Sequence, residues 1–142
     1  MTISLSDDER RAIVVAEEIA DVTIRDCLID DDHDRIAFVV KAGEVGKAIG
    51  RDGETVSRIE ARLGRDVTLV EDAPTPEGFV ANALAPAAVY DVTIEDRDEE
   101  RVAFAEVDQA DTGTAIGADG RTIELARRLA ARHFEIDDVQ LA

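Results

Sequence analysis

The sequence has no tryptophan, one tyrosine, four phenylalanines and a single cysteine, so disulfide bonds and aromatic stacking can contribute little. One cysteine cannot form an internal disulfide, and we interpret Cys27 as a small buried apolar residue. Some nucleic-acid binders stack bases on exposed aromatic side chains, and so few aromatics disfavour that mode of binding. We expect Phe38, Phe104, Phe134 and Tyr90 to lie in the core.

Signals for a membrane, a metal or catalysis are also missing. No apolar run approaches the ~18 residues of a membrane-spanning helix, and the N-terminus lacks the basic and apolar blocks of a signal peptide. His33 and His133 are isolated, and no nucleophile signature accompanies them. We interpret Asp30 to Asp34 as a polar turn because no distant ligands complete a metal site. The sequence predicts a cytoplasmic protein with no membrane contact, metal, cofactor or enzymatic activity.

The charge is strongly one-sided. The chain carries 33 acidic and 16 basic residues, a net charge of −17, and only Lys41 and Lys47 are lysines. Because salt screens charges at molar concentration within a few Å, such self-repulsion costs little there. We therefore predict a halophilic protein; an acidic mesophilic protein is the alternative.

One eight-residue segment occurs twice, as Gly46–Gly53 and Gly113–Gly120, with six identical positions. Two further matches stand upstream. Asp-Val-Thr-Ile occurs at 21–24 and 91–94, and Arg-apolar-Ala-Phe occurs at 35–38 and 101–104. A repeated order of similar segments indicates two copies of one structural unit. The 142 residues suit two small domains, which we place at 1–72 and 73–142.

Each copy predicts the element order αββααβ. Ser6 to Glu9 has the pattern of a capping box, and the first helix extends to about Ala20. Strands follow, then a short helix up to the repeated segment, and a helix from Glu54 to Leu63 that Gly64 ends. In the second copy we expect the last helix to end at about Arg132 and a strand to span 134–141. The predicted class is α+β, with a three-stranded sheet covered on one face by helices in each unit.

Around the repeated segment, acidic residues do not outnumber basic ones. Residues 46–66 carry five basic and four acidic side chains, and residues 113–133 carry four basic and two acidic ones. All other positions together carry 7 basic and 27 acidic side chains. An anionic ligand could approach here; the alternative is that helices simply collect arginine in i,i+4 pairs.

Glycines at both ends of Gly50–Gly53 and Gly117–Gly120 permit a sharp turn and a close approach by a ligand. A helix N-terminus follows each turn, and its free amides and dipole attract phosphate. We expect Asp52 and Asp119 to cap these helices through their carboxylates.

At Ile49-Gly50-Arg51-Asp52-Gly53 and Ile116-Gly117-Ala118-Asp119-Gly120 the chain resembles the KH family of single-stranded nucleic-acid binders. In that family the Gly-x-x-Gly loop clamps the backbone of about four nucleotides. The element order is similar to the type II topology, and two such domains in tandem resemble the archaeal NusA family of transcription elongation and termination factors. The resemblance implies single-stranded RNA as ligand, and RNA polymerase or other transcription factors as further partners. The first loop has Arg51 as a basic residue, whereas Ala118 leaves the second without one.

The implied RNA-binding residues are those of the two loops and the basic side chains beside them: Lys47, Ile49, Gly50, Arg51, Asp52, Gly53, Arg58, Arg62, Ile116, Gly117, Ala118, Asp119, Gly120 and Arg121. Two other functions remain open. One is a KH protein of ribosome biogenesis, although this chain lacks the basic tails usual there. The other is a protein-interaction scaffold whose degenerate KH units no longer bind RNA, which the acids in both loops favour.

Overall fold

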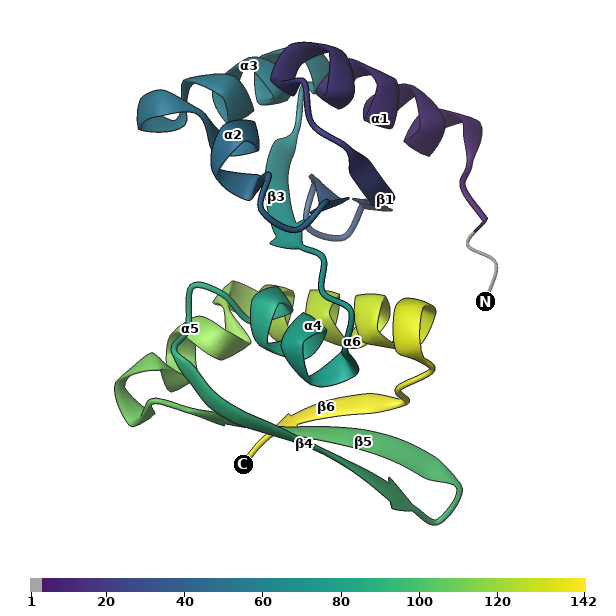
Figure 1. Cartoon of the computed structure of the whole chain (residues 1–142), viewed down its shortest axis with the longest axis vertical. Helices are drawn as coiled ribbons and strands as arrows, with labels where there is room; N and C mark the ends of the chain where they lie inside the picture. Colours follow the sequence, from purple (N-terminus) through teal and green to yellow (C-terminus); the bar gives the residue numbers. More distant parts are fainter. Residues whose placement is uncertain (1–3) are drawn as a thin grey trace. The chain divides into compact units, whose positions relative to one another are not determined.

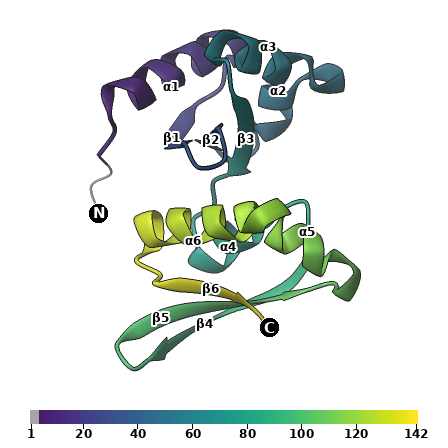
Figure 2. The same ribbon diagram turned by 180° about the vertical axis from the view of Figure 1, so that it is seen from behind.

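The computed structural model describes residues 4–142, and they form two units that divide between Asp72 and Ala73. Each unit has one three-stranded sheet with its helices on one face (Figures 1 and 2). The order helix, strand, strand, short helix, helix, strand occurs in both. The predicted α+β class and repeated αββααβ order are therefore confirmed.

In the first unit a central strand pairs in opposite senses with its two neighbours, since β2 runs antiparallel to β1 and parallel to β3. The capping box forms, because the Glu9 amide donates to Ser6 Oγ and the Ser6 amide donates to the Glu9 carboxylate. The elements are α1 (Asp7–Ala20), β1 (Ile24–Asp30), β2 (Arg35–Val40), α2 (Val45–Ile49), η1 (Arg51–Gly53), α3 (Glu54–Leu63) and β3 (Asp66–Glu71).

The second unit repeats this sheet, with β5 between β4 and β6. Its first helix has a start typical of its residue types, with Thr75 accepting a hydrogen bond from the Gly78 amide and Pro76 at the first position. None of the described helices has the length and apolar character needed to span a bilayer. The elements are α4 (Pro76–Ala83), β4 (Val89–Arg97), β5 (Glu100–Val107), η2 (Gln109–Asp111), α5 (Thr112–Ile116), η3 (Ala118–Gly120), α6 (Arg121–Phe134) and β6 (Asp138–Leu141).

The core of the first unit lies between the sheet and the helices. Ala16 on α1, Phe38 on β2 and Ile59 on α3 are at most 1% exposed and belong to one cluster. Small alanines along α1 let that helix lie close to the sheet. All six residues of β2 are buried. Five of them form the unbroken apolar run from Ile36 to Val40, which is typical of a strand covered on both faces, and the sixth is Arg35.

The strand registers show that two of the three repeated segments do not occupy matching positions. A bulge interrupts β1 just after Ile24, which pairs with Val40, and a bulge interrupts β4 just after Val89, which pairs with Val107. Val89 therefore corresponds to Ile24, whereas Ile94 pairs with Ala103 in the middle of its strand. The Asp-Val-Thr-Ile match is wrong as a structural correspondence.

The same registers shift the Arg-apolar-Ala-Phe match by one residue. If Val107 corresponds to Val40, then Ala105 corresponds to Phe38, and Phe104 lies on the opposite face. Phe38 is fully buried, whereas Phe104 is half-buried, with the Arg97 guanidinium 4.6 Å from its ring centre. Of the three repeats, only the glycine-rich segment keeps its place in the fold.

Three local expectations in the second unit are wrong. The last helix continues to Phe134, whose ring lies 5.3 Å from that of Phe79, and β6 begins only at Asp138. Packing between these rings extends the helix past its expected end. Tyr90 is 66% exposed, because its hydroxyl donates a hydrogen bond to Asp108 at the surface.

The acidic turn of the first unit contains a buried ion pair. Asp30 and Arg35 have side chains 5% exposed, and Arg35 Nε lies 2.9 Å from Asp30 Oδ2. His33 is not isolated as predicted, because its Nδ1 lies 2.9 Å from the same oxygen. Burial alone would raise the pKa of Asp30, but the hydrogen bonds with His33 and Arg35 outweigh it and lower that pKa. Asp31, Asp32 and Asp34 of the turn are solvent-exposed, whereas His33 is half-buried and Asp30 itself belongs to the core.

Candidate nucleic-acid interface

The two Gly-x-x-Gly loops have nearly the same backbone. Gly50 has φ 78° and ψ 174°, and Gly117 has φ 80° and ψ 166°. Asp52 and Asp119 share φ 55° and ψ 27°, and the closing glycines follow with φ 74°. Each loop thus combines an extended, positive-φ glycine with two left-handed residues, a chain path that two different sequences reproduce.

The first glycine of each loop has no room for a side chain. A Cβ on Gly50 would lie 2.8 Å from the Thr55 amide nitrogen and in contact with its hydroxyl, and Gly117 meets Thr122 in the same way. These threonines are site residues that the sequence analysis missed. The signal was available, because a threonine stands two residues after the last glycine in both copies.

Replacing Gly50 by alanine should destabilise the first unit by about 1–3 kcal/mol, the cost of a non-glycine residue in a sparsely populated φ/ψ region. The matched control is Gly46→Ala in α2, where a Cβ meets nothing within 4 Å. Alanine there should be neutral or stabilise by up to ~1 kcal/mol. Denaturant unfolding in molar KCl measures both. Equal stability of the two variants would contradict this account of the loop.

The loop aspartates do not cap the helices that follow, contrary to the prediction. The N-cap residues are Gly53 and Gly120, and no side chain caps α3 or α6. Asp52 and Asp119 are exposed in the left-handed region, which aspartate tolerates better than most residues. Their conformation explains the residue type, and the N-cap residue of both helices is a glycine with no side chain to cap them.

Basic side chains gather at the first loop. Arg51, Arg58 and Arg62 are exposed, and none makes a hydrogen bond or ion pair within the described residues. Arg58 and Arg62 stand four residues apart on α3, so they follow one face of that helix. Lys47 is less available, since its Nζ lies 3.1 Å from Asp21 Oδ2 in an exposed pair. Exposed pairs of this kind hold their partners weakly.

The second loop has its cation in another place. Arg121 follows the last glycine, where the first unit has Glu54, and its Nε donates to the Ala118 carbonyl at 3.3 Å. The second loop therefore has a basic partner, although it lies outside the four loop residues. The positions that match Arg58 and Arg62 are Leu125 and Leu129, which are buried. The second unit thus lacks arginine at these two positions, and α6 carries Arg127, Arg128 and Arg132 at others.

An apolar residue is exposed beside each loop. Ile49 and Ile116 are 41% and 40% exposed, whereas the preceding alanines are buried. An exposed isoleucine next to uncovered amides offers a base an apolar contact without aromatic stacking. Within residues 4–142 no three His, Cys, Asp or Glu side chains converge on a point where a metal ion could bind.

Each half of the chain, with its Gly-x-x-Gly loop, matches the model of a known protein family. A model described as a KH domain matches residues 10–74, and a model described as a NusA-like second KH domain matches residues 76–142. The "Probable transcription termination protein NusA" of Halobacterium salinarum is 61% identical over 99% of both chains. The chain belongs to the archaeal NusA family.

Further relatives support this membership in the NusA family. The protein of the same name from Halococcus morrhuae is 55% identical over the full length of both chains. A solved structure titled "Crystal structure of APE1850" superposes with a TM-score of 0.86 at 28% identity, covering 97% of this chain and 100% of that one. The close relatives come from halophiles, which confirms the halophilic character that the composition predicts.

Proposed function

We propose that the chain binds single-stranded RNA through its two Gly-x-x-Gly loops and acts as a transcription elongation or termination factor. Residues 1–72 and 73–142 would each be one RNA-binding domain. The observation that carries this proposal is the loop backbone, repeated to within 8° (ψ 174° at Gly50 and 166° at Gly117) and positioned before a helix whose N-cap is a glycine. Such amides can donate hydrogen bonds to phosphate oxygens in both units.

The surrounding side chains suit a ligand that is anionic and unpaired. Exposed arginines lie beside the first loop, Arg121 lies beside the second, and an isoleucine is exposed next to each. Salt weakens single-strand binding with a slope of about −0.7 per neutralised phosphate. In molar salt the backbone amides and the isoleucines would therefore supply more of the affinity than arginine does. RNA polymerase and other transcription factors are the partners that the family name suggests.

The proposed RNA contacts are the loop residues Gly50, Arg51, Asp52, Gly53, Gly117, Ala118, Asp119 and Gly120, with Lys47, Ile49, Arg58, Arg62, Ile116 and Arg121 around them. The scaffold hypothesis has one observation in its favour. Asp52 and Asp119 are exposed and cap no helix, so they would stand near a bound phosphate. RNA binding therefore requires that the hydrogen bonds from the backbone amides to the phosphate outweigh the repulsion between these carboxylates and the phosphate.

Arg51→Asp tests the choice between these functions. Two acids within the first loop should repel the RNA backbone and remove a charged hydrogen bond, which lowers affinity about 10- to 100-fold. Ala118→Asp should have a smaller effect at the second loop. The measurement is the affinity for a mixed-sequence single-stranded RNA in molar KCl, with a thermal melt to confirm folding.

Arg11→Asp is the matched control, because it makes the same charge change on α1 at a side chain that is 75% exposed. RNA affinity should stay within about twofold of the parent, since charges far from the loop are screened. If Arg51→Asp and Ala118→Asp both bind RNA like the parent, the loops are only helix corners and the scaffold hypothesis replaces RNA binding.

A further inference from the structure

The outer edge of the first sheet is closed by carboxylates. The Ile24 amide donates to Glu17 Oε2 at 3.0 Å, and the Ile29 amide donates to Glu9 Oε2 at 3.3 Å. Both glutamates come from α1, which lies alongside β1 in the structure. The Cys27 amide between them donates to the carboxylate of Asp26. Backbone donors on this edge are therefore occupied, and no added strand can use them.

The matching edge of the second sheet is open. Strands β4 and β5 turn through Asp98 and Glu99 alone, so Arg97 and Glu100 form the hydrogen-bonded pair that closes a two-residue hairpin. Bonded and non-bonded pairs alternate from there, which directs the amides of the non-bonded residues away from β5. The outward amides belong to Val92, Ile94 and Asp96, and no side chain among the described residues accepts from them.

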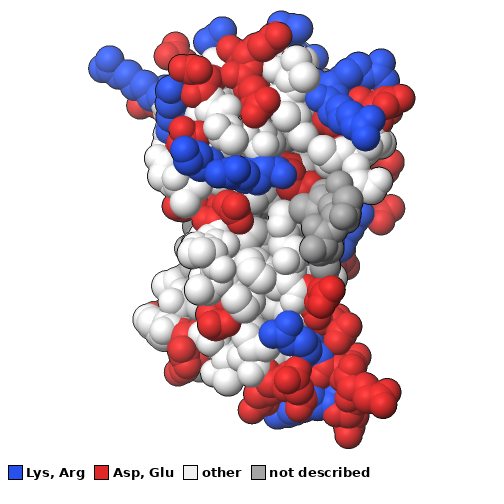
Figure 3. All heavy atoms as spheres, turned by 45° about the vertical axis from the view of Figure 1, so that its right-hand side comes forward, with Lys and Arg blue, Asp and Glu red and all other residues white. Residues whose placement is uncertain are grey.

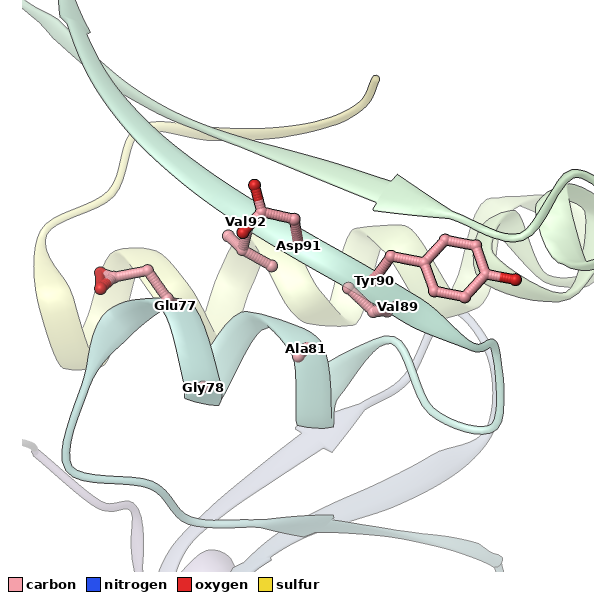
Figure 4. A pocket seen from close by; sticks show the side chains of 7 residues that line it. All are labelled: Glu77, Gly78, Ala81, Val89, Tyr90, Asp91 and Val92. Atoms are coloured by element: carbon pink, nitrogen blue, oxygen red, sulfur yellow. The ribbon is translucent and has the colours of Figure 1, made fainter.

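A shorter helix causes this difference. Helix α1 has 14 residues and α4 has 8, so α4 has no turn that corresponds to the one carrying Glu9. An open groove of about 410 Å³ lies instead between α4 and β4 (Figure 4). In Figure 4 the side chains of Glu77 and Asp91 stand at this groove, and Tyr90 projects beyond it. The groove is next to the strand edge and on elements that carry neither Gly-x-x-Gly loop.

The charge around this edge selects its occupant. Residues 91–100 contain six acidic side chains and one arginine, Arg97, which is paired with Glu95 at 2.8 Å. Figure 3 shows the acidic side chains crowded at the lower end of the second unit. RNA would be repelled here, and a second copy of the chain would bring the same acids face to face.

We propose that the β4 edge binds an extended, lysine- or arginine-bearing segment of a partner protein. The segment adds to the sheet as a fourth strand, through hydrogen bonds to the amides of Val92, Ile94 and Asp96. Its basic side chains meet Asp91 and Glu95 on one face of the sheet, while an alternate side chain enters the groove beside α4. Backbone hydrogen bonds remain effective in molar salt, where long-range attraction between charges does not.

The experiment uses the full chain in molar KCl with a synthetic peptide that alternates threonine and lysine. Amide hydrogen exchange monitored by NMR should slow at Val92, Ile94 and Asp96 when the peptide is added. Asp96→Pro removes one outward donor and leaves the β4–β5 hydrogen bonds in place, as proline does on an edge strand. Asp96→Thr is the control, since it loses the same charge and keeps the amide.

Asp96→Pro should bind the peptide about 3- to 10-fold more weakly than Asp96→Thr, the effect of one hydrogen bond. A peptide with glutamate in place of lysine should not bind. The proposal fails if the two variants bind alike, if the acidic peptide binds equally well, or if neither peptide slows exchange at these amides. Protection by RNA would assign the edge to the RNA site, and protection without any ligand in a sedimenting dimer would assign it to a second copy.

Discussion

Asp30→Ala should lower the free energy of unfolding by about 3–5 kcal/mol, the usual cost of leaving one partner of a buried ion pair without the other. Asp30 and Arg35 are both 4% exposed, so Arg35 would lose its charged acceptor where water cannot replace it. Denaturant unfolding in molar KCl gives the difference. The control is Asp31→Ala, because Asp31 forms an ion pair with Arg65 at a side chain that is 79% exposed. That change should cost less than about 1 kcal/mol.

A double variant separates the lost charge pair from lost packing. In Asp30→Leu with Arg35→Met both charges disappear, and apolar replacements of buried pairs are often neutral or stabilising. The double variant should therefore be more stable than Asp30→Ala. If it is equally unstable, the defect comes from packing and not from an unpaired arginine.

The contribution of Asp30 to stability should also depend on pH in a defined direction. Its pKa is lower in the folded chain than in the unfolded one, so folding is favoured while the carboxyl is ionised. The difference between the parent and Asp30→Ala should be constant from neutral pH down to about 4, near the unfolded pKa. It should then shrink as the pH falls through the lower folded value. A difference that grows with acid would contradict this assignment.

Stability should rise strongly between dilute buffer and molar KCl. The net charge of −17 repels itself at low ionic strength, and molar salt reduces the screening length to about 3 Å. Relief of only ~2 kcal/mol would raise the melting temperature by roughly 8–16 °C in units of this size. Thermal melts over a KCl series measure it, and a flat melting temperature would remove self-repulsion as an explanation for the composition.

The hairpin tip provides a matched variant for the salt experiment. Asp98→Asn, Glu99→Gln and Glu100→Gln together remove three exposed acids from the tip of the acidic β4–β5 hairpin. This triple variant should be more stable than the parent in dilute buffer and equal to it in molar salt. If the triple variant is more stable than the parent by the same amount at both salt concentrations, the gain comes from the turn conformation and not from the lost charge.

Much of the fold could be predicted because local signals agree with the tertiary structure. Helix α3 begins and ends where Gly53 and Gly64 place it, with both glycines left-handed. The boundaries failed where distant residues decide, as at Phe134, which packs on Phe79 from another helix. The sequence places Tyr90 in the core, because no neighbouring residue reveals the hydrogen bond that its hydroxyl donates to Asp108.

The candidate site was predictable in position but not in detail. Glycines that need positive φ identify the loops from sequence alone. Whether Asp52 caps α3 depends on where its carboxylate points, and a left-handed Asp52 with Gly53 as the N-cap leaves it outside capping geometry. Likewise, Arg121 approaches the second loop only because its side chain turns back to the Ala118 carbonyl.

The strand registers also limit how the two halves of the gene could exchange sequence. A crossover within the glycine-rich segments joins residues that occupy the same place in both units, so the hybrid keeps inward residues inward. A crossover at Arg-apolar-Ala-Phe exchanges Phe38 with Phe104, which lie on opposite faces of their sheets. Such a hybrid would turn one strand inside out. Recombination between the halves should therefore preserve the fold when it occurs in the loops and damage it when it occurs in the preceding strand. Of the three repeated segments, only the loops can be kept similar to one another by such exchange.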